Sequence, residues 1–355
     1  MIKVALVVGT YTGGGIGVVV DSLVREAAPL GVEYTVVTKR ALARTKYAKT
    51  IVHPAHSLSL LDALKKFDII HVMGGSILVI PSLLSGKPTV FTFQGQSPPH
   101  LHGGLVKNSK AYAIEALYAA TIRKFDVITS ASKFGMDDLT RRYGVKKSVW
   151  IPNGVDRKIF HPLPAKDPGV RAIRKKFPRK LLLGVGNLYP VKGWMETLKW
   201  FESYIEAGSK ASLAIAGEGV LRKPMLEKIR RGKLRGRVAL LGEISLESLN
   251  KYYNACDAYV SGSPYEGFCL PAIEALACGK PICVRRRGAM IEHALDSGCG
   301  AVFDDSAKSF ANATNAVLAM KPSVVRRKAA KYLGPFTWEN AALEYVKIYR
   351  KLIKG

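Results

Sequence analysis

The sequence predicts an α/β protein with two doubly wound domains, each a parallel sheet covered by helices. Short runs rich in β-branched residues alternate with amphipathic helical stretches along the whole chain. The alternation breaks near residue 161 and resumes at residue 180. At 355 residues, the chain is long enough for two domains of about 150–200 residues each.

The predicted strands are short apolar segments, as expected for strands buried on both faces of a parallel sheet. In the first domain they are 3–8, 33–38, 68–73, 88–93, 126–131 and 147–152. In the second domain they are 180–186, 212–219, 237–242, 257–263, 280–285 and 300–304. Helical spacing lies between them, and Gly31 is placed to end the first helix.

The domain boundary is predicted near residue 162. Segment 161–180 holds four prolines and dense positive charge, which is typical of a linker running into a short basic helix. Residues 1–162 are therefore assigned to the first domain and 163–336 to the second. The last stretch, 337–355, is expected to form a helix capped by Thr337 and to complete the first domain.

The charge balance is the most unusual bulk property. The chain has 54 Lys and Arg against 27 Asp and Glu, a formal net charge of +27. This predicts attraction to anionic lipid headgroups, a phosphorylated acceptor or nucleic acid, and a generally cationic surface is the plain alternative. Nucleic acid is the least supported partner, because no RNA-recognition motif accompanies the charge.

The N-terminal segment and the cysteine usage indicate a cytoplasmic protein. The N-terminal segment lacks a signal-peptide pattern, and no apolar run approaches the roughly 20 residues that span a bilayer. A cytoplasmic location, with contact at the inner membrane face, is therefore expected. The five cysteines form no C-x-x-C pair, so free thiols are expected and a metal site is not.

The stretch SPYEGFCLPAIEALACGKPI, residues 263–282, carries the strongest chemical signal. Glu266 follows a predicted strand, and Glu274 lies in a short helix expected to begin near Pro271. Ligands bind α/β domains at this strand-end rim, where a carboxylate can accept bonds from vicinal sugar hydroxyls. The amides of Gly267 and Phe268, with the helix N-terminus, would face a phosphate. Alternatively, Glu274 serves only the helix dipole and Glu266 is merely solvated.

This stretch, with segments 151–162, 181–201 and 240–268, resembles the retaining glycosyltransferases of family 4. In the first domain the loop GGGIGVVVDSL and the segments HVMGG, PSLLSGKPTVFTFQG and DVITSASKFGMDDL also match. The resemblance implies the GT-B fold, in which two Rossmann-like domains face a central cleft. It further implies sugar transfer from a UDP or GDP sugar to a lipid-linked or phosphorylated acceptor, without a metal or other cofactor.

The resemblance also implies roles for individual residues. Glu266 corresponds to the acid that contacts the donor sugar, Glu274 to the acid on the nucleotide ribose, and Lys192 to the lysine on the departing diphosphate. Gln94 takes the catalytic position in the first domain. The other donor contacts implied are Gly267, Phe268, Cys269, Leu270, Asn187, Gly14 and Gly15.

Three positions depart from the family pattern. Asn187 stands where an arginine is usual, and an amide cannot give a phosphate the charged, bidentate contact of a guanidinium. Arg285 is a candidate to compensate, unless residues 285–287 are a solvated charge run. Gln94 replaces a histidine, for which His100 and His102 are candidate substitutes unless they are solvent-exposed. Cys269 replaces a glycine and would narrow the sugar pocket.

Several alternatives remain at this point. An NADP-dependent oxidoreductase would use the early glycine loop and Arg40 after the second strand. A GT-B scaffold weakened in catalysis by Asn187 and Gln94 would bind sugar, nucleotide or polyanion. The stripe of Val106, Ala113, Ile114, Leu117, Tyr118, Ile122 and Phe125 is explained either by core packing or by membrane contact. The donor sugar, the acceptor and the oligomeric state do not follow from the sequence.

Overall fold

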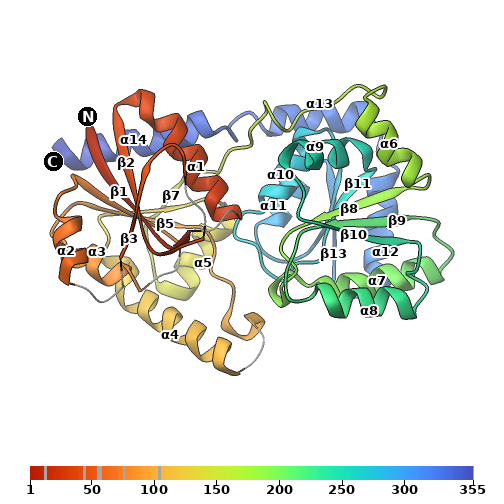
Figure 1. Ribbon diagram of the computed structural model, residues 1–355, viewed down its shortest axis with the longest axis horizontal. Coiled ribbons are helices and arrows are strands. Elements are labelled where there is room, and N and C mark those ends of the chain that lie inside the picture. Colours follow the sequence, from red (N-terminus) through yellow and green to blue (C-terminus); the bar gives the residue numbers. More distant parts are fainter. Residues whose placement is uncertain (12–13, 43–44, 54–57, 75–76, 103–104, 355) are drawn as a thin grey trace. The chain divides into compact units, whose positions relative to one another are not determined.

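The computed structural model describes residues 1–11, 14–42, 45–53, 58–74, 77–102 and 105–354 (Figure 1). The chain forms two compact units. Unit 1 comprises Met1–His100, Gly104–Gly154 and Pro335–Gly355, and unit 2 comprises Leu101–Gly103 and Val155–Gly334. Apart from Leu101–Gly103, the chain passes from unit 1 to unit 2 at residues 154–155, whereas the sequence placed the boundary after residue 162.

Unit 1 is built on a seven-stranded parallel sheet in the order β3-β2-β1-β4-β5-β6-β7. Its strands are β1 (Ile2–Tyr11), β2 (Val32–Ala41), β3 (Lys49–Val52), β4 (Ile69–Met73), β5 (Thr89–Phe93), β6 (Val127–Ser130) and β7 (Val149–Trp150). The six predicted strands are confirmed, and β3 was missed. β3 is an edge strand with no fully buried residue, so it lacks the apolar pattern of its neighbours.

Helices cover both faces of this sheet (Figure 1). They are α1 (Gly15–Ala27), α2 (Leu58–Leu64), α3 (Val79–Leu84), α4 (Leu105–Thr121), α5 (Lys133–Tyr143) and α14 (Trp338–Lys354), with 3-10 turns η1 (Ala28–Leu30), η2 (Pro99–His102) and η3 (Ile122–Lys124). Gly31 ends η1, which continues α1, with a left-handed φ of 87°. Thr337 caps α14 as predicted, because its Oγ1 accepts from the Asn340 amide at 3.1 Å.

The apolar stripe of α4 and η3 faces the core of unit 1. Tyr118, Ile122 and Phe125 are buried there, and Ile114 and Leu117 pack against them. The inclusion of Ala113 was wrong: it is exposed, and Ala111 is buried instead. The side chain of Val106 lies outside the described residues. Membrane contact through this stripe is therefore ruled out for the buried positions.

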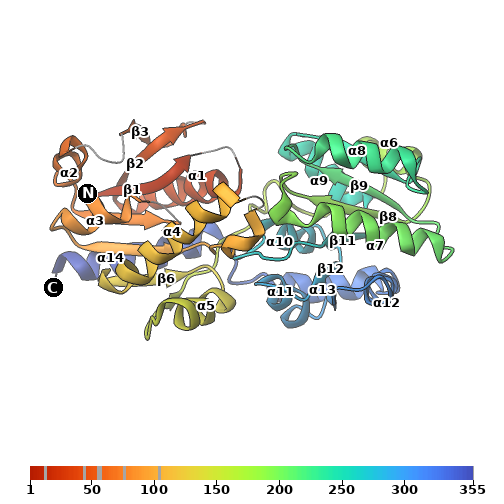
Figure 2. The ribbon, with the colours of Figure 1, turned by 90° about the horizontal axis from the view of Figure 1, so that it is seen from below.

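Unit 2 has a six-stranded parallel sheet in the order β10-β9-β8-β11-β12-β13. In Figure 2 the labelled strands β9, β8, β11 and β12 follow one another in this order. The strands are β8 (Leu181–Val185), β9 (Ser212–Ala216), β10 (Val238–Gly242), β11 (Ala258–Ser261), β12 (Ile282–Arg285) and β13 (Gly300–Phe303). All six were predicted. The five cysteines of this unit are free and buried, as expected.

Eight α-helices and one 3-10 turn can be followed in the described part of unit 2. They are α6 (Pro168–Lys176), η4 (Pro190–Lys192), α7 (Trp194–Glu206), α8 (Arg222–Arg231), α9 (Leu246–Ala255), α10 (Leu270–Ala277), α11 (Met290–Asp296), α12 (Ala307–Leu318) and α13 (Pro322–Tyr332). α6 is the basic helix expected after the proline-rich segment, and Asp167 caps it. Across the described ranges, no helix is both long and apolar enough to cross a membrane.

A buried polar network joins α14 to the sheet of unit 1. His71 on β4 contacts the Tyr349 hydroxyl through Nδ1 and the Thr92 hydroxyl through Nε2, each at 2.6 Å. Tyr349 also contacts the Tyr34 hydroxyl at 2.9 Å, and Tyr345 contacts Thr92 at 3.0 Å. Each of these polar groups has a partner, so burying them carries no large unpaired penalty.

The network makes the stability of unit 1 sensitive to acid. Burial lowers the pKa of His71 to about 3, so the unfolded chain binds a proton that the folded chain excludes between about pH 6.5 and pH 3. We expect the unfolding free energy to fall through this window by up to about 1.4 kcal/mol per pH unit from this residue. Urea titrations of His71→Gln should show a shallower pH slope, whereas exposed His100→Gln should keep the wild-type slope.

Candidate active site

Glu266 and Lys192 meet at the carboxyl ends of two neighbouring strands. Lys192 ends η4, which follows β8, and Glu266 lies in the loop after β11. Because β8 and β11 are paired in parallel, their following loops leave the same edge of the sheet. Lys192 Nζ lies 2.6 Å from Glu266 Oε1. The sequence-predicted donor residues of these two segments therefore form one ion pair.

The pair is half-buried and remains open to a ligand. The Lys192 side chain is 30% exposed and that of Glu266 is 14% exposed. Burial acts to lower the pKa of Lys192, but the adjacent Glu266 carboxylate outweighs it and the pKa is raised above its ordinary value. Lys192 is therefore a fixed ammonium at neutral pH. It has more N–H donors than this one contact uses, so it can also meet an anion.

Glu274 lies in a different environment from Glu266. It is the fifth residue of α10, which begins at Leu270, one residue before the Pro271 expected there. Its carboxyl group is buried, Oε2 accepts from the Tyr253 hydroxyl at 2.8 Å, and burial raises its pKa to about 7. The first turn of α10 holds no acidic residue. The alternative in which Glu274 serves the helix dipole and Glu266 is merely solvated is therefore wrong.

The turn between the two acids is held by its backbone carbonyls. The Glu266 carbonyl accepts from the Ala289 amide at 2.9 Å, and the Phe268 carbonyl accepts from His293 Nε2 at 2.7 Å. Cys269 then enters α10 with a left-handed φ of 73°, a conformation that glycine adopts more easily. Its thiol is buried 3.6 Å from the Tyr259 hydroxyl.

The four predicted donor-binding residues of this turn differ in how far they are exposed to solvent. Phe268 and Cys269 are buried, whereas Gly267 and Leu270 are half-buried. Sequence reasoning missed Tyr253 and His293, which contact Glu274 and the Phe268 carbonyl. Tyr253 lies in an ordinary amphipathic helix and His293 in a short one, so no motif distinguished them.

The candidates of unit 1 lie after β1 and β5, at the carboxyl edge of that sheet. Gly14 caps α1 and Gly15 is its exposed first residue; a Cβ on Gly15 would meet no atom within 4 Å. Gln94 Oε1 accepts from Asn153 Nδ2 at 2.9 Å. His100 is exposed in η2, as the plain alternative expected. Gly13 and the His102 side chain lie outside the described residues.

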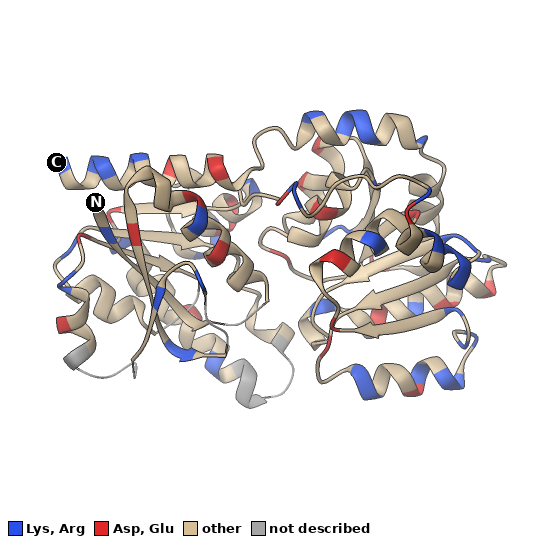
Figure 3. Ribbon diagram, turned by 45° about the horizontal axis from the view of Figure 1, so that its top comes forward, with Lys and Arg blue, Asp and Glu red and all other residues tan. Residues whose placement is uncertain are grey.

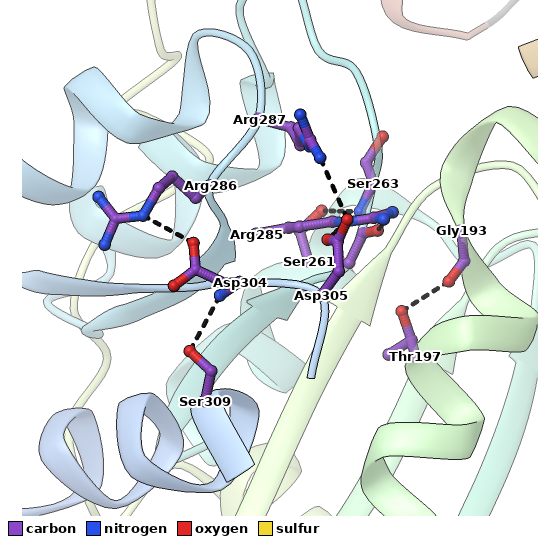
Figure 4. Close-up of polar contacts among 11 residues, drawn as sticks. Gly193, Thr197, Ser261, Ser263, Arg285, Arg286, Arg287, Asp304, Asp305 and Ser309 are labelled. Atoms are coloured by element: carbon purple, nitrogen blue, oxygen red, sulfur yellow. Dashed lines mark hydrogen bonds and ion pairs between the residues drawn. The ribbon is translucent and has the colours of Figure 1, made fainter. Parts of the chain in front are cut away.

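Asn187 and Arg285 stand at the strand ends of unit 2. Asn187 follows β8 and is exposed, and its carbonyl accepts from Trp194 Nε1 at 2.9 Å. Arg285 ends β12 and is paired with Asp305, while Arg286 is paired with Asp304 (Figure 4). The alternative of a solvated charge run is wrong for Arg285, whose side chain is only 13% exposed.

The fold and this site define a glycosyltransferase of the GT-B class. Residues 170–333 match the family model described as glycosyl transferases group 1, and residues 13–158 match the model of glycosyltransferase family 4. The chain belongs to the family 4 glycosyltransferases. The alternative of an NADP-dependent oxidoreductase is therefore wrong.

Relatives and solved structures agree with this assignment. A GDP-mannose-dependent phosphatidylinositol dimannoside mannosyltransferase of Mycobacterium tuberculosis is 29% identical over 63% of this chain and 57% of its own length. Mannosylfructose-phosphate synthase of Agrobacterium fabrum is 28% identical over 64% of this chain and 53% of its own length. The chain thus spans little more than half of these relatives.

Two structures show the same fold over almost the whole chain. Sucrose-phosphate synthase of Thermosynechococcus elongatus has a TM-score of 0.80 at 22% identity, covering 100% of both chains. The Anabaena protein HepE, in complex with UDP and glucose, has a TM-score of 0.78 at 15% identity, covering 98% of this chain and 99% of its own.

Burial of Glu274 predicts a conflict between stability and ligand binding. Without ligand, its raised pKa means that stability is lost as pH rises from about 4.5 to about 7, where only the unfolded chain has released this proton. We expect Glu274→Gln to be more stable than the wild type at pH 8 by about 1–3 kcal/mol, and to differ less at pH 5. Denaturant titrations at both pH values test this, with exposed Glu196→Gln as the control. A Glu274→Gln protein that is less stable at pH 8 would contradict it.

Proposed function

We propose that this chain transfers a sugar from a nucleotide diphosphate sugar, of UDP or GDP type, with retention of anomeric configuration and without a metal ion. Unit 2 binds the donor and unit 1 provides the acceptor side. The observation that carries the proposal is the Lys192–Glu266 pair at the carboxyl ends of β8 and β11. This is where an open α/β sheet binds its ligand.

Lys192 supplies the positive charge that the leaving group requires. As the bond from the anomeric carbon to the diphosphate oxygen breaks, negative charge grows on that oxygen. An ammonium already fixed by Glu266 meets this charge without reorganising. Glu266 in turn has a second carboxylate oxygen, which can accept from a hydroxyl of the donor sugar. Glu274 binds the ribose, for which the ligand must replace or share the Tyr253 contact.

The acceptor step needs no carboxylate nucleophile. The acceptor oxygen forms the new bond to the anomeric carbon on the face the diphosphate leaves, and its proton passes to the departing phosphate oxygen. In this proposal the free oxygen of Glu266 accepts from a sugar hydroxyl, while its other oxygen stays bound to Lys192. Gln94 and its partner Asn153 can orient sugar hydroxyls but cannot carry a proton.

A catalytically weakened binding module is the second candidate. One observation favours it. Gln94 stands where the family has histidine, and its amide oxygen accepts a hydrogen bond from Asn153 rather than contacting an acid. Such a protein would bind the nucleotide sugar through Lys192 and Glu274 and transfer nothing. The two candidates share the donor site and differ in turnover.

An anionic or lipid-linked acceptor is the class we favour. The net charge of +27 suits such a partner, and Figure 3 shows Lys and Arg spread over the helices of both units. One relative, a mannosyltransferase of Xanthomonas oryzae, is named for its cellobiosyl-diphosphopolyprenol acceptor and is 25% identical over 82% of this chain. Its name and the charge together support a phosphorylated acceptor at the cytoplasmic membrane surface.

Calorimetry with UDP, GDP and ADP tests the donor site. We expect micromolar binding of UDP or GDP, and Lys192→Met should weaken it about 10- to 100-fold, because charge-assisted hydrogen bonds contribute about 1.5–3 kcal/mol. Lys199→Met removes an exposed lysine from nearby α7 and should leave the affinity unchanged. If no nucleoside diphosphate binds, or if both variants bind like the wild type, the proposal fails. Binding without any transferred sugar in mass spectra across an acceptor panel would select the binding module.

Flotation with liposomes tests the acceptor surface. We expect binding to vesicles that contain anionic phosphatidylglycerol, because an anionic surface attracts each nearby Lys or Arg by about 1 kcal/mol. The bound fraction should fall steeply as salt screens the charges, with a Debye length of about 10 Å at 0.1 M. Phosphatidylcholine vesicles are the control. Absence of binding at low salt would remove the membrane-surface acceptor and leave the donor site unaffected.

A further inference from the structure

Arg285 is held on three sides behind the proposed donor site. Its Nε lies 2.5 Å from Asp305 Oδ1, its Nη1 donates to the Gly262 carbonyl at 3.3 Å, and its guanidinium lies 5.2 Å from the centre of the Trp200 ring. Figure 4 shows the side chain extended toward Ser261, at the end of β11, and Ser263, in the loop that follows. A guanidinium anchored in this way is part of the framework and is not free to reach out to a ligand.

The carbonyl that Arg285 contacts lies at a very tight backbone crossing. A Cβ on Gly193 would be 2.4 Å from the Gly262 carbonyl oxygen, and a Cβ on Gly262 would be 2.1 Å from Thr197 Oγ1. The contact at Gly193 is with backbone and excludes any side chain there, whereas a side chain at Gly262 would have to displace the Thr197 hydroxyl. The turn after Lys192 therefore lies directly on the loop that precedes Glu266, and the Gly262 carbonyl is enclosed between Gly193 and Arg285.

The same crossing fixes the ion pair. Gly193 follows Lys192, and Gly262 lies on the short loop that leads to Glu266. Ser263 adds a bond from its hydroxyl to the Val191 carbonyl at 3.3 Å. Any shift of the Gly262 carbonyl is passed to the ion pair, because the backbone on both sides of the crossing is short and close-packed.

We propose that Arg285 is a positioning residue for the Lys192–Glu266 pair. It holds the Gly262 carbonyl against the turn of Lys192 and so sets the place where the ammonium meets the diphosphate. The inference rests on the proposed function insofar as its effect is measured by nucleotide binding. It replaces the hypothesis that Arg285 contacts the diphosphate itself.

The chemistry of the clamp requires arginine. A planar guanidinium can donate to Asp305 and Gly262 at once while its face lies on Trp200, whereas a lysine offers a single point charge. Asp305 is itself set by a second arginine, because its Oδ2 accepts from Arg287 Nη2 at 3.1 Å. The hydrogen bond from Arg285, and to a smaller extent the one from Arg287, keeps the pKa of Asp305 below its ordinary value.

The next residue provides a matched control. Arg286 has the same charge, neighbours Arg285 in sequence and pairs with Asp304 at 2.9 Å. Its side chain is 51% exposed, and its ion pair with Asp304 involves neither Gly262 nor Trp200. Arg285→Met and Arg286→Met therefore remove one charge and one acidic contact each, and only the former releases the Gly262 carbonyl.

A double-mutant cycle on nucleotide affinity tests the proposal. We expect Arg285→Met to weaken binding of UDP or GDP about 5- to 50-fold, Arg285→Lys to restore only part of it, and Arg286→Met to change it less than about twofold. In a Lys192→Met background, Arg285→Met should have almost no further effect. Equal losses in both backgrounds would show that Arg285 acts independently of Lys192 and would overturn the proposal.

A ligand-free readout separates this inference from the proposed function. Acetylation of Lys192 by a limiting amine-reactive reagent, followed by peptide mass spectrometry, reports how firmly the ammonium is paired. We expect the rate to rise about 3- to 10-fold in Arg285→Met and to stay at the wild-type value in Arg286→Met, with circular dichroism unchanged in both. An unchanged rate in Arg285→Met would overturn the inference even if UDP or GDP binds. A raised rate without nucleotide binding would keep it and reject the donor site.

Discussion

The close crossing of two backbone segments, at Gly193 and Gly262, is the constraint on which the site depends. Without it, Lys192 and Glu266 would leave adjacent strands and remain apart. The crossing is possible because Gly193 has no side chain to meet the Gly262 carbonyl and takes a φ of 64° that glycine tolerates. Gly262 likewise has no side chain to meet the Thr197 hydroxyl. A half-buried ion pair adds little to stability by itself. Its value lies in placing one ammonium at one point of the sheet edge.

The two acids of the site are held by opposite means. Glu266 faces an ammonium, whereas Glu274 faces only the hydroxyl of Tyr253 and is buried, which raises its pKa to about 7. Glu266 is therefore stabilised as a carboxylate, whereas burial favours the neutral form of Glu274 as long as no ligand is bound. Different environments for paired carboxyl groups are a common way for one site to assign two roles.

The sequence predicted the sheets well and the supporting residues poorly. Twelve strands followed from apolar runs. The roles of Lys192 and Glu266 came from the family resemblance, and their ion pair was not predicted. The edge strand β3 has no such run, and Ala113 was placed on the wrong face of α4 because alanine marks no face by itself. His293 and Arg285 act on backbone carbonyls 25 and 23 residues away, and such contacts leave no trace in spacing.

Those carbonyl contacts also explain how a strained turn persists. Among the described non-glycine residues, Cys269 alone has a positive φ, at a cost of about 1–2 kcal/mol. The Glu266 and Phe268 carbonyls accept bonds from Ala289 and His293, at the start of α11 and within it, and the Cys269 carbonyl accepts from Ala272 in α10 itself. These hydrogen bonds hold the backbone of the turn in place and so keep Cys269 in its positive-φ conformation. Strain kept in this way is typical of a segment shaped for a ligand rather than for stability.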